Sequence, residues 1–293
     1  MPDHIEAAPF SAGVTLYDPA RLDAAPELVR ALPLAVRLWH NEALRKLVIV
    51  VLLGLAWEGY ARWLDNPILF PTLTETLQAF RDRIADGTLP ARTLATLQTL
   101  LLGYVAGVVL AGLLTVLAIT TRFGTSLLET LTAMFNPLPA IALLPLALTW
   151  FGLGTPSLVF VLVHSVLWAV ALNTHSGFRS VSQTLRMVGR NYELRGLRYV
   201  FLILIPAAFP AILTGLKVGW AFAWRTLIAA ELVFGAASGK GGLGWFIFEN
   251  RNVLEIPSVF AGLLTVILIG LLVENLIFRT LERRTVKRWG MQG

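Results

Sequence analysis

TLRMVGRNYELRGLRYVFLILIPAAFPAILTGLKVG, residues 184–219, is the stretch of sequence that decides the fold. Its first part carries four arginines, and its second part is apolar and interrupted by Pro206 and Pro210. On either side lie apolar runs of the length that membrane spans need. A basic segment between two spans has to stay in water or be held by a partner. The stretch therefore predicts a polar link that leads into a membrane span.

The composition is that of an integral membrane protein. Of the 293 residues, 56% are hydrophobic and 14% are charged, and the mean hydropathy is +0.70. Soluble globular chains average about 25% charged residues, so this chain has too little charge to cover a water-facing surface. The net charge of +6 does not indicate nucleic-acid binding, because the cations lie at the edges of apolar runs, where they set membrane topology.

The N-terminal segment, residues 1–44, is predicted to be cytoplasmic. It starts MPDHIEAAPF, which is acidic and lacks an apolar core, so no cleaved signal peptide is expected. The part after Pro26 fits either a short amphipathic helix on the membrane surface or a partly ordered tail. The whole sequence contains no cysteine, which excludes disulfides and cysteine-ligated metal sites.

Six apolar segments are predicted to cross the membrane as helices, at residues 47–63, 97–119, 127–151, 156–172, 206–234 and 258–278. The third carries Pro137, Pro139 and Pro145, which predict a kinked span that faces the inside of the bundle. In the second, Gly103 and Gly107 form a pair that favours close helix packing. The fold class is therefore an all-α membrane protein.

The polar segments between the spans predict the topology of the transmembrane domain, residues 45–293. The link before the fifth span and the C-terminal tail both carry an excess of arginine. The loops after the first, third and fifth spans carry no net charge. Because cationic loops stay inside, both termini and the basic link are expected to be cytoplasmic. In the first of the neutral loops, Thr72 and Glu75 form a capping box that predicts a helix to about Ala85.

The fifth span carries the candidate residues of a solute path. Within about 60° of one another on this helix lie Lys217, Trp220, Trp224 and Glu231. Arg225, about 80° from Lys217, suits an oxyanion, because its planar fork matches a carboxylate, a sulfonate or nitrate. The alternatives are ion pairing with Glu58 or Glu274 of other helices, or snorkelling of Lys217 to the cytoplasmic edge. In the fourth span, His164 fits either an interhelical hydrogen bond or a proton relay.

The chain is predicted not to be an enzyme and to hold no metal or cofactor, since no catalytic constellation is present. The segment GAASGKGG is similar to a phosphate loop, but its glycines Gly235 and Gly239 are one residue too close. Gly241 also stands where a Ser or Thr should bind Mg²⁺. We interpret this segment as a flexible loop.

Several segments together indicate a family: AWEGYARWL, LFPTLTETLQAFRDRIADGTL, NPLPAIALLPLALTWFGLGTPS, LIPAAFPAILTGLKVGWAFAWRTLIAAEL, GLGWFIFE and the closing RWG. On these segments the chain, from about Leu47 onward, resembles the membrane subunits of bacterial ABC importers of the nitrate, sulfonate and taurine group. The resemblance implies a type I importer transmembrane domain in the bacterial inner membrane. Such a subunit forms the path for a small, anionic solute.

In that family the basic link holds a signature that starts Glu-Ala-Ala, continues with Gly six residues later and ends with Leu-Pro thirteen after that. We align this chain with the signature by matching Ile205 and Pro206 to its final Leu-Pro. Met187, Val188 and Gly189 then occupy the Glu-Ala-Ala positions, and Glu193 occupies the position of the signature's glycine. The resemblance implies a coupling helix at about residues 184–198 that docks on an ATPase through Met187, Val188, Gly189, Arg190, Tyr192 and Glu193. It also implies a hinge at Pro206 and Pro210.

The residues of this helix agree with docking. Leu185, Val188 and Tyr192 share one face, and Arg186, Arg190 and Glu193 share another. An amphipathic link lying on anionic lipid is the alternative.

The resemblance implies partners as well. They are a second copy of this chain, two cytoplasmic ATPase subunits that bind ATP and Mg²⁺, and a periplasmic solute-binding protein; membrane lipid surrounds the assembly. Nitrate, sulfonates and taurine are the implied solutes. An ion-coupled secondary transporter or channel of six spans is the alternative function, but transporters of that kind usually show broken helices in related halves, and the sequence has no internal repeat.

Overall fold

The structure is a computed structural model that describes residues 41–234 and 241–287. It consists of two compact units, residues 1–54 and residues 55–293, whose boundary lies inside helix α2 (Glu42–Leu64). The described part of the first unit is the N-terminal half of α2. The predicted surface helix before residue 41 lies outside the described residues.

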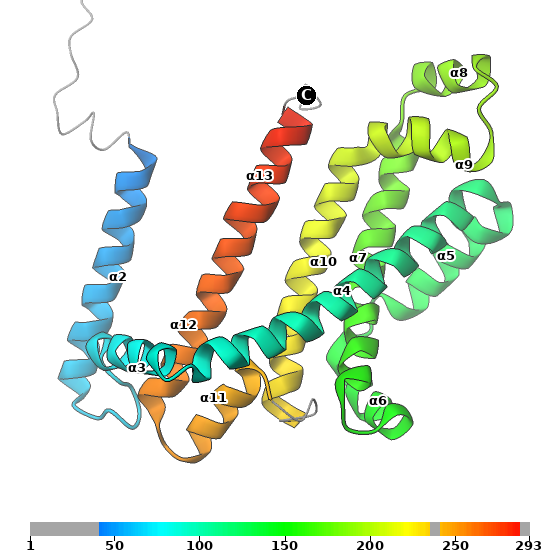
Figure 1. Cartoon of the computed structure of the whole chain (residues 1–293). Helices are drawn as coiled ribbons and strands as arrows, with labels where there is room; N and C mark the ends of the chain where they lie inside the picture. The colour runs from blue at the N-terminus through cyan, green and yellow to red at the C-terminus, as the bar shows by residue number, and fades with distance from the viewer. Residues whose placement is uncertain (1–40, 235–240, 288–293) are drawn as a thin grey trace, which may run out of the picture. The chain divides into compact units, whose positions relative to one another are not determined.

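The second unit is helical in its described residues (Figure 1). After α2 come α3 (Leu73–Ala85), α4 (Thr88–Thr120), α5 (Arg122–Phe135), the 3-10 turn η2 (Ala140–Leu143), α6 (Leu144–Phe151), α7 (Thr155–Ser180), α8 (Gln183–Asn191), α9 (Gly196–Tyr199), the π-helical turn η3 (Val200–Leu204), α10 (Ile205–Phe234), α11 (Leu243–Asn252), α12 (Ile256–Leu272), the π-helical turn η4 (Val273–Phe278), α13 (Arg279–Glu282) and the π-helical turn η5 (Arg283–Lys287).

Five of the described helices or helical runs are long and apolar enough to cross a membrane: α2, α4, α7, the run from α9 to α10 and the run from α12 to η5. The bent pair of α5 with η2 and α6 makes a sixth if it counts as one span. The all-helical, membrane-spanning fold class is thus confirmed.

The third predicted span is broken rather than kinked. Helix α5 ends at Phe135, helical turns resume at Ala140, and the two parts meet at 87°. Pro137 and Pro139 have no N–H to donate, and their rings clash with the preceding turn, so a helix cannot continue through them. The break leaves an irregular segment at residues 136–139.

The second span begins nine residues earlier than predicted, because α4 starts at Thr88. Its first turns contain the charged residue Arg92. The Arg92 guanidinium lies 3.2 Å from a carboxylate oxygen of Glu249 and donates to the Gly241 carbonyl at 3.3 Å. These partners, distant in the sequence, make the charge acceptable in the helix.

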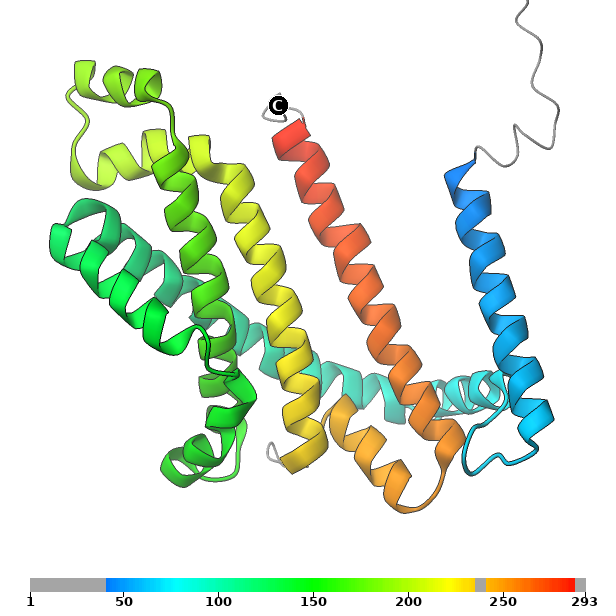
Figure 2. The same ribbon diagram turned by 180° about the vertical axis from the view of Figure 1, so that it is seen from behind.

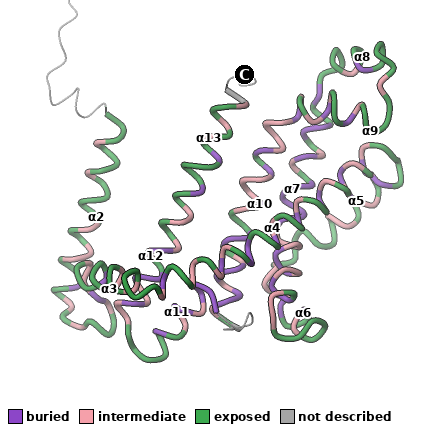
Figure 3. Tube along the Cα trace, in the orientation of Figure 1, coloured by how far each residue is buried: buried purple, intermediate pink, exposed green. Residues whose placement is uncertain are grey.

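Helix α7 lies at the centre of the second unit and packs against α4 and α10. Of the residues in its apolar window 61% are buried, against 28% in α4 (Figure 3). A Cβ placed on Gly103 would lie 2.5 Å from Leu162 Cβ, and one on Gly107 would lie 2.7 Å from Val166 Cβ. Only glycine permits this approach, so the close packing predicted for the pair is confirmed.

The second unit presents two different ends. Helices α8 and α9 and the C-terminal end of α13 lie at one end, the top of Figure 1, and α3, α6 and α11 lie at the other. Figure 2 shows the same division from behind. Helix α3 begins with the predicted capping box, in which Glu75 N donates to Thr72 Oγ1 at 3.1 Å and Thr72 N donates to Glu75 Oε2 at 2.8 Å.

Candidate functional site

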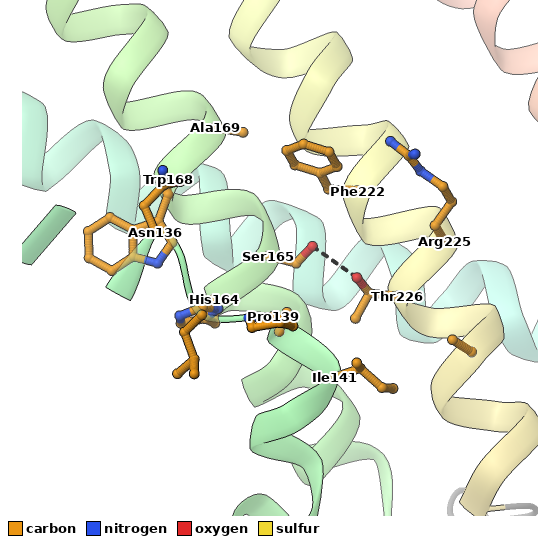
Figure 4. Close-up of a pocket in the computed structure, with 13 residues that line it drawn as sticks. Asn136, Pro139, Ile141, His164, Ser165, Trp168, Ala169, Phe222, Arg225 and Thr226 are labelled. Atoms are coloured by element: carbon orange, nitrogen blue, oxygen red, sulfur yellow. Dashed lines mark hydrogen bonds between the residues drawn. The ribbon is translucent and has the colours of Figure 1, made fainter. Parts of the chain in front are cut away.

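A cavity of about 400 Å³ opens where the break between α5 and α6 faces α7 and α10. The irregular segment contributes Asn136, Leu138 and Pro139, and η2 adds Ala140 and Ile141. From α7 come His164, Ser165, Trp168 and Ala169, and from α10 come Phe222, Arg225, Thr226 and Ala229 (Figure 4). The four α10 residues follow at helical offsets of 3, 4 and 7, so they share one face. The prolines therefore create the space, and two straight helices wall it.

Arg225 supplies the positive charge of the cavity. Its side chain is exposed, and its Nε donates to the Ala221 carbonyl at 3.1 Å. The guanidinium carbon lies 5.2 Å from the centre of the Phe222 ring, a cation–π contact. Within the described residues Arg225 forms no ion pair. Because a guanidinium has five N–H donors, four of them stay available.

The remaining polar groups of the cavity wall are the Asn136 amide, the His164 imidazole and two hydroxyls. The hydroxyl oxygens of Ser165 and Thr226 lie 3.2 Å apart and join α7 to α10 (Figure 4). His164 meets the ring of Trp168 edge-on, with 6.0 Å between ring centres. The wall thus combines one cation, hydroxyl groups and apolar rings, a combination suited to a small anion.

The predicted stripe lies on a different face of α10. Lys217 Nζ is 2.9 Å from Glu274 Oε1 in η4 and 3.9 Å from Glu282 in α13. Trp220 packs edge-on against Tyr104 of α4 and Phe278 of η4, and Trp224 is buried. These residues hold α10 against its neighbours and do not line the cavity with Arg225. The ion pair with Glu274, one of the alternatives stated above, is present.

Glu58, the other suggested partner, lies elsewhere. Its carboxylate accepts hydrogen bonds from Arg62 Nε and from the backbone and side chain of Thr74. It therefore ties α2 to the first turn of α3.

Glu231 is buried and closes the start of α11. Its two carboxylate oxygens lie 3.1 and 3.0 Å from the Thr96 hydroxyl, and Oε2 accepts the Gly244 N–H at 2.9 Å. The same hydroxyl oxygen accepts the Leu243 N–H at 2.8 Å. Because the first N–H groups of a helix lack partners within the helix, a carboxylate and a hydroxyl here satisfy them.

Gly241 and Gly242 are the part of the predicted loop that the structure describes, and α11 begins directly after them. A Cβ on Gly242 would fall against the Glu231 carboxylate, and one on Gly244 would lie 2.6 Å from Glu231 Cβ. These glycines let the first turn of α11 approach α10. Residues 235–240 of the predicted loop lie outside the described residues.

The predicted helix at 184–198 is divided into α8 and α9 by a tight turn. Leu194 N donates to the Gly189 carbonyl, and Glu193 N donates to the Arg190 carbonyl, both at 2.9 Å. Glu193 has φ +54°, the left-handed conformation that glycine favours after a helix. Glu193 occupies the signature's glycine position. Its left-handed conformation therefore raises the free energy of this turn by roughly 1 kcal/mol relative to glycine.

The predicted docking residues in α8 and in the turn after it are exposed, except Gly189. Met187, Val188 and Tyr192 are exposed by 54%, 38% and 76%. Gly189 is buried, and a Cβ there would lie 2.7 Å from the Tyr199 ring. Arg190 and Glu193 are exposed but line a second hollow, on the other side of α8.

Arg186 fastens α8 to the end of α7. Its guanidinium donates to the carbonyls of Phe178 at 2.7 Å and Val181 at 3.1 Å. The last carbonyls of a helix have no partner within the helix, and they carry partial negative charge. Arg186 therefore joins the start of α8 to the end of α7.

Pro206 and Pro210 lie in the first turns of α10. Pro206 follows a π-helical turn in which Ile205 N donates to the Val200 carbonyl. The wider turn accommodates the missing N–H and the ring of proline. The Pro210 carbonyl accepts the Thr214 hydroxyl at 3.0 Å.

Sequence reasoning found Arg225 and missed Phe222, Ser165 and Thr226. Phe222 and Thr226 stand three residues before and one residue after Arg225, positions on the same helix face or next to it, and that spacing is the signal that was present. Ser165 carries no local signal, because its place depends on how α7 packs against α10.

Known proteins match this arrangement over most of its length. A family model described as the binding-protein-dependent transport system inner membrane component covers residues 103–287. The chain belongs to this family. Its members are ABC transporter permeases, multi-pass proteins of the inner membrane that are not themselves enzymes and that work with ATPase and solute-binding partners.

Individual relatives align over most of the permease. A putative ABC transporter permease of Methanocaldococcus jannaschii is 29% identical over 246 residues, which cover 83% of this chain and 91% of that relative. The nitrate import permease of Synechocystis sp. is 30% identical over 247 residues, covering 82% and 88%. The taurine transport system permease of Escherichia coli is 29% identical over 244 residues, covering 80% and 86%.

The Glu231 contacts predict a structural role for this carboxylate. Glu231→Ala leaves the Gly244 N–H and the Thr96 hydroxyl without their acceptor, which lowers the free energy of unfolding by about 2 kcal/mol. Thermal unfolding in detergent measures the loss. Glu255→Ala, at an exposed carboxylate of the α11–α12 turn, is the control and leaves the midpoint unchanged. Unchanged stability of Glu231→Ala together with lost solute uptake would contradict the structural role.

Proposed function

We propose that the permease is one of two identical membrane subunits of an ATP-driven importer and forms the path for a small anion. Relatives named for nitrate, taurine and aliphatic sulfonates support this solute class. A periplasmic binding protein delivers the solute. Two cytoplasmic ATPase subunits bind ATP and Mg²⁺, and the permease itself contributes no cofactor.

The position of Arg225 is the observation that supports an anionic solute. It lies in a cavity large enough for a small solute, and the described residues around it include no carboxylate. Lys217, the other cation of α10, is neutralised by Glu274. An unpaired cation within a membrane span is costly and is retained where it has a function. An oxyanion that enters the cavity supplies the missing partner.

In this proposal the chain has six spans and both termini lie in the cytoplasm. Arginines concentrate at 179, 186, 190, 195 and 198, around α8 and α9, and again in η5. These two basic regions lie at the same end of the second unit (Figure 1). The positive-inside rule assigns that end to the cytoplasm, so α8 faces the ATPase and α3, α6 and α11 face the binding protein.

Helix α8 couples the ATPase to the cavity. Its exposed side chains Met187, Val188 and Tyr192 form the docking face. Arg186 joins α8 to α7, and Gly189 packs on Tyr199, which leads through η3 into α10. Because α7 and α10 wall the cavity, a movement of α8 changes its width. The π-helical turn and the two prolines at the start of α10 are the hinge.

Replacing Arg225 tests the anion path. Arg225→Ala removes the charge that binds the solute, and loss of a charge-assisted hydrogen-bonded contact of about 2–3 kcal/mol lowers the rate of uptake roughly 30- to 150-fold. Uptake of nitrate, taurine and ethanesulfonate by the assembled importer in proteoliposomes measures the effect. Assembly and basal ATP hydrolysis persist.

Arg122→Ala, at an exposed arginine outside the cavity, is the matched control and keeps normal uptake. Undiminished anion uptake by Arg225→Ala would contradict the assignment of solute binding to Arg225. So would a wild-type importer that takes up none of the three anions.

Replacing Val188 tests the docking face. Val188→Asp puts a charge into an apolar contact and weakens association with the ATPase at least tenfold, equivalent to about 1.4 kcal/mol. Co-purification of the ATPase with the permease measures this. Gln78→Asp adds the same charge at an exposed position of α3, at the opposite end of the second unit, and leaves association intact. Equal losses in the two variants, or no loss in either, would refute the assignment of this face.

A further inference from the structure

Carbon atoms make up most of the exposed lining of the cavity beside Arg225. In the irregular segment Leu138 and Pro139 are exposed, and so is Phe222 on α10, with exposed fractions of 37% for Leu138 and 44% for Phe222. The side chains of Phe222 and Ile141 lie between the ribbons of α7 and α10 (Figure 4). We call Leu138, Pro139, Ile141 and Phe222 the apolar wall. A solute in the cavity therefore meets hydrocarbon surface as well as a guanidinium group.

The volume of the cavity exceeds what an inorganic anion needs. It is about 400 Å³, within the range of roughly 300–1,000 Å³ that is typical of pockets for organic ligands. A molecule of liquid water occupies about 30 Å³, and nitrate is only slightly larger than water. Nitrate bound at Arg225 would thus leave most of the apolar wall in contact with water. A solute with an apolar body would remove that surface from water, which is favourable.

The charges of the lining fit a solute with a single charged group. Among the described residues that line the cavity, Arg225 is the one with a permanent charge, and none is Asp or Glu. The ammonium group of a zwitterion such as taurine would lose its water, find no counter-charge and be repelled by the guanidinium group. A second negative group on the solute would lack a cation. An uncharged body avoids both costs.

We propose that the cavity selects an organic monoanion with an uncharged, apolar body, and that the apolar wall determines this selectivity. The anionic group, a sulfonate or a carboxylate, binds the Arg225 guanidinium group, and the body packs against Phe222 and Leu138. Phe222 contacts both parts of the solute site, because its ring centre lies 5.2 Å from the guanidinium carbon and its exposed edge faces the cavity. This selectivity rests on the proposed function, since it applies only where the cavity is the anion path.

Thermal unfolding of the permease–ATPase complex in detergent, with added solute, tests the proposal without the binding protein, whose own selectivity would mask that of the cavity. The probes are sodium nitrate, sodium ethanesulfonate, sodium butanesulfonate and taurine. Each probe is titrated against the wild type and against Arg225→Ala, which corrects for the effect of salt on stability. The concentration that gives half of the Arg225-dependent stabilisation measures the affinity of the cavity for that probe.

The expected order of affinity follows from the lining. Butanesulfonate binds at least fivefold more tightly than ethanesulfonate, because each methylene group that is fully buried contributes about fourfold. Ethanesulfonate binds more tightly than nitrate and more tightly than taurine, which differs from it by the ammonium group. Nitrate or taurine that binds as tightly as butanesulfonate, in a way that depends on Arg225, would overturn the selectivity and leave the anion path intact. No Arg225-dependent binding of any probe would contradict the anion path and, with it, the selectivity.

Variants of the apolar wall test which residues determine the preference. Leu138→Ala and Phe222→Ala each remove exposed carbon surface and lower the preference for butanesulfonate over ethanesulfonate by about twofold or more. The ratio of the two affinities is the readout, because Phe222→Ala also removes the ring beside Arg225 and weakens both probes. Phe201→Ala removes an exposed ring outside the cavity and keeps the preference. An unchanged preference in both wall variants would overturn the role of the apolar wall.

Discussion

A bilayer offers no hydrogen bonds to backbone groups, so every place where this chain breaks a helix must supply its own partners. The end of α7 takes them from Arg186, and the start of α11 takes them from Glu231 and Thr96. The break between α5 and α6 is different, because Pro137 and Pro139 remove donors and the segment opens on a cavity. Arg186, Glu231 and Thr96 thus stabilise the scaffold, and the break between α5 and α6 forms the cavity wall.

This constraint separates structural charges from functional ones. Glu231 and Lys217 both lie on a membrane-spanning helix, and both have partners within the described residues. Glu231 is hydrogen-bonded to Thr96, and Lys217 forms an ion pair with Glu274. Arg225 has only a backbone carbonyl and the Phe222 ring. A charge in a span is costly unless it is paired. The unpaired one, which also faces the cavity, is the residue to which we assign solute binding.

Much of the fold follows from local sequence patterns. The apolar runs, the Thr72–Glu75 capping box and the Gly103–Gly107 pair each depend on residues a few positions apart, and each predicted its element correctly. The prolines indicated an irregular third span, although not an 87° break. Patterns of this length contain the information needed for helices and their close packing.

The candidate site was less predictable, because its decisive contacts join distant parts of the chain. Helix periodicity placed Lys217, Trp220 and Trp224 on one face correctly, but periodicity does not say which neighbour that face meets. Thr96 lies 135 positions from Glu231, and no local pattern relates them. The division of α8 from α9 depends on Glu193 in a left-handed conformation, which sequence favours only at glycine.

Helices α7 and α10 extend from α8 to the cavity. At one end of the unit they are joined to α8 through Arg186 and through Tyr199, and further along the same two helices wall the cavity. In the coupling that we propose, a movement of α8 reaches the cavity through α7 and α10. The central claim is that this cavity is the path.

Cysteine labelling tests that claim most directly, because the native chain contains no cysteine. Thr226→Cys places a thiol in the cavity wall, and Ala223→Cys places one on the same helix in a buried position. In the assembled, transporting complex, the account predicts that an anionic methanethiosulfonate modifies the cysteine at 226 and that transported solute slows the reaction. The cysteine at 223 stays unmodified. An unreactive cysteine at 226, or one that solute does not protect, would contradict the account.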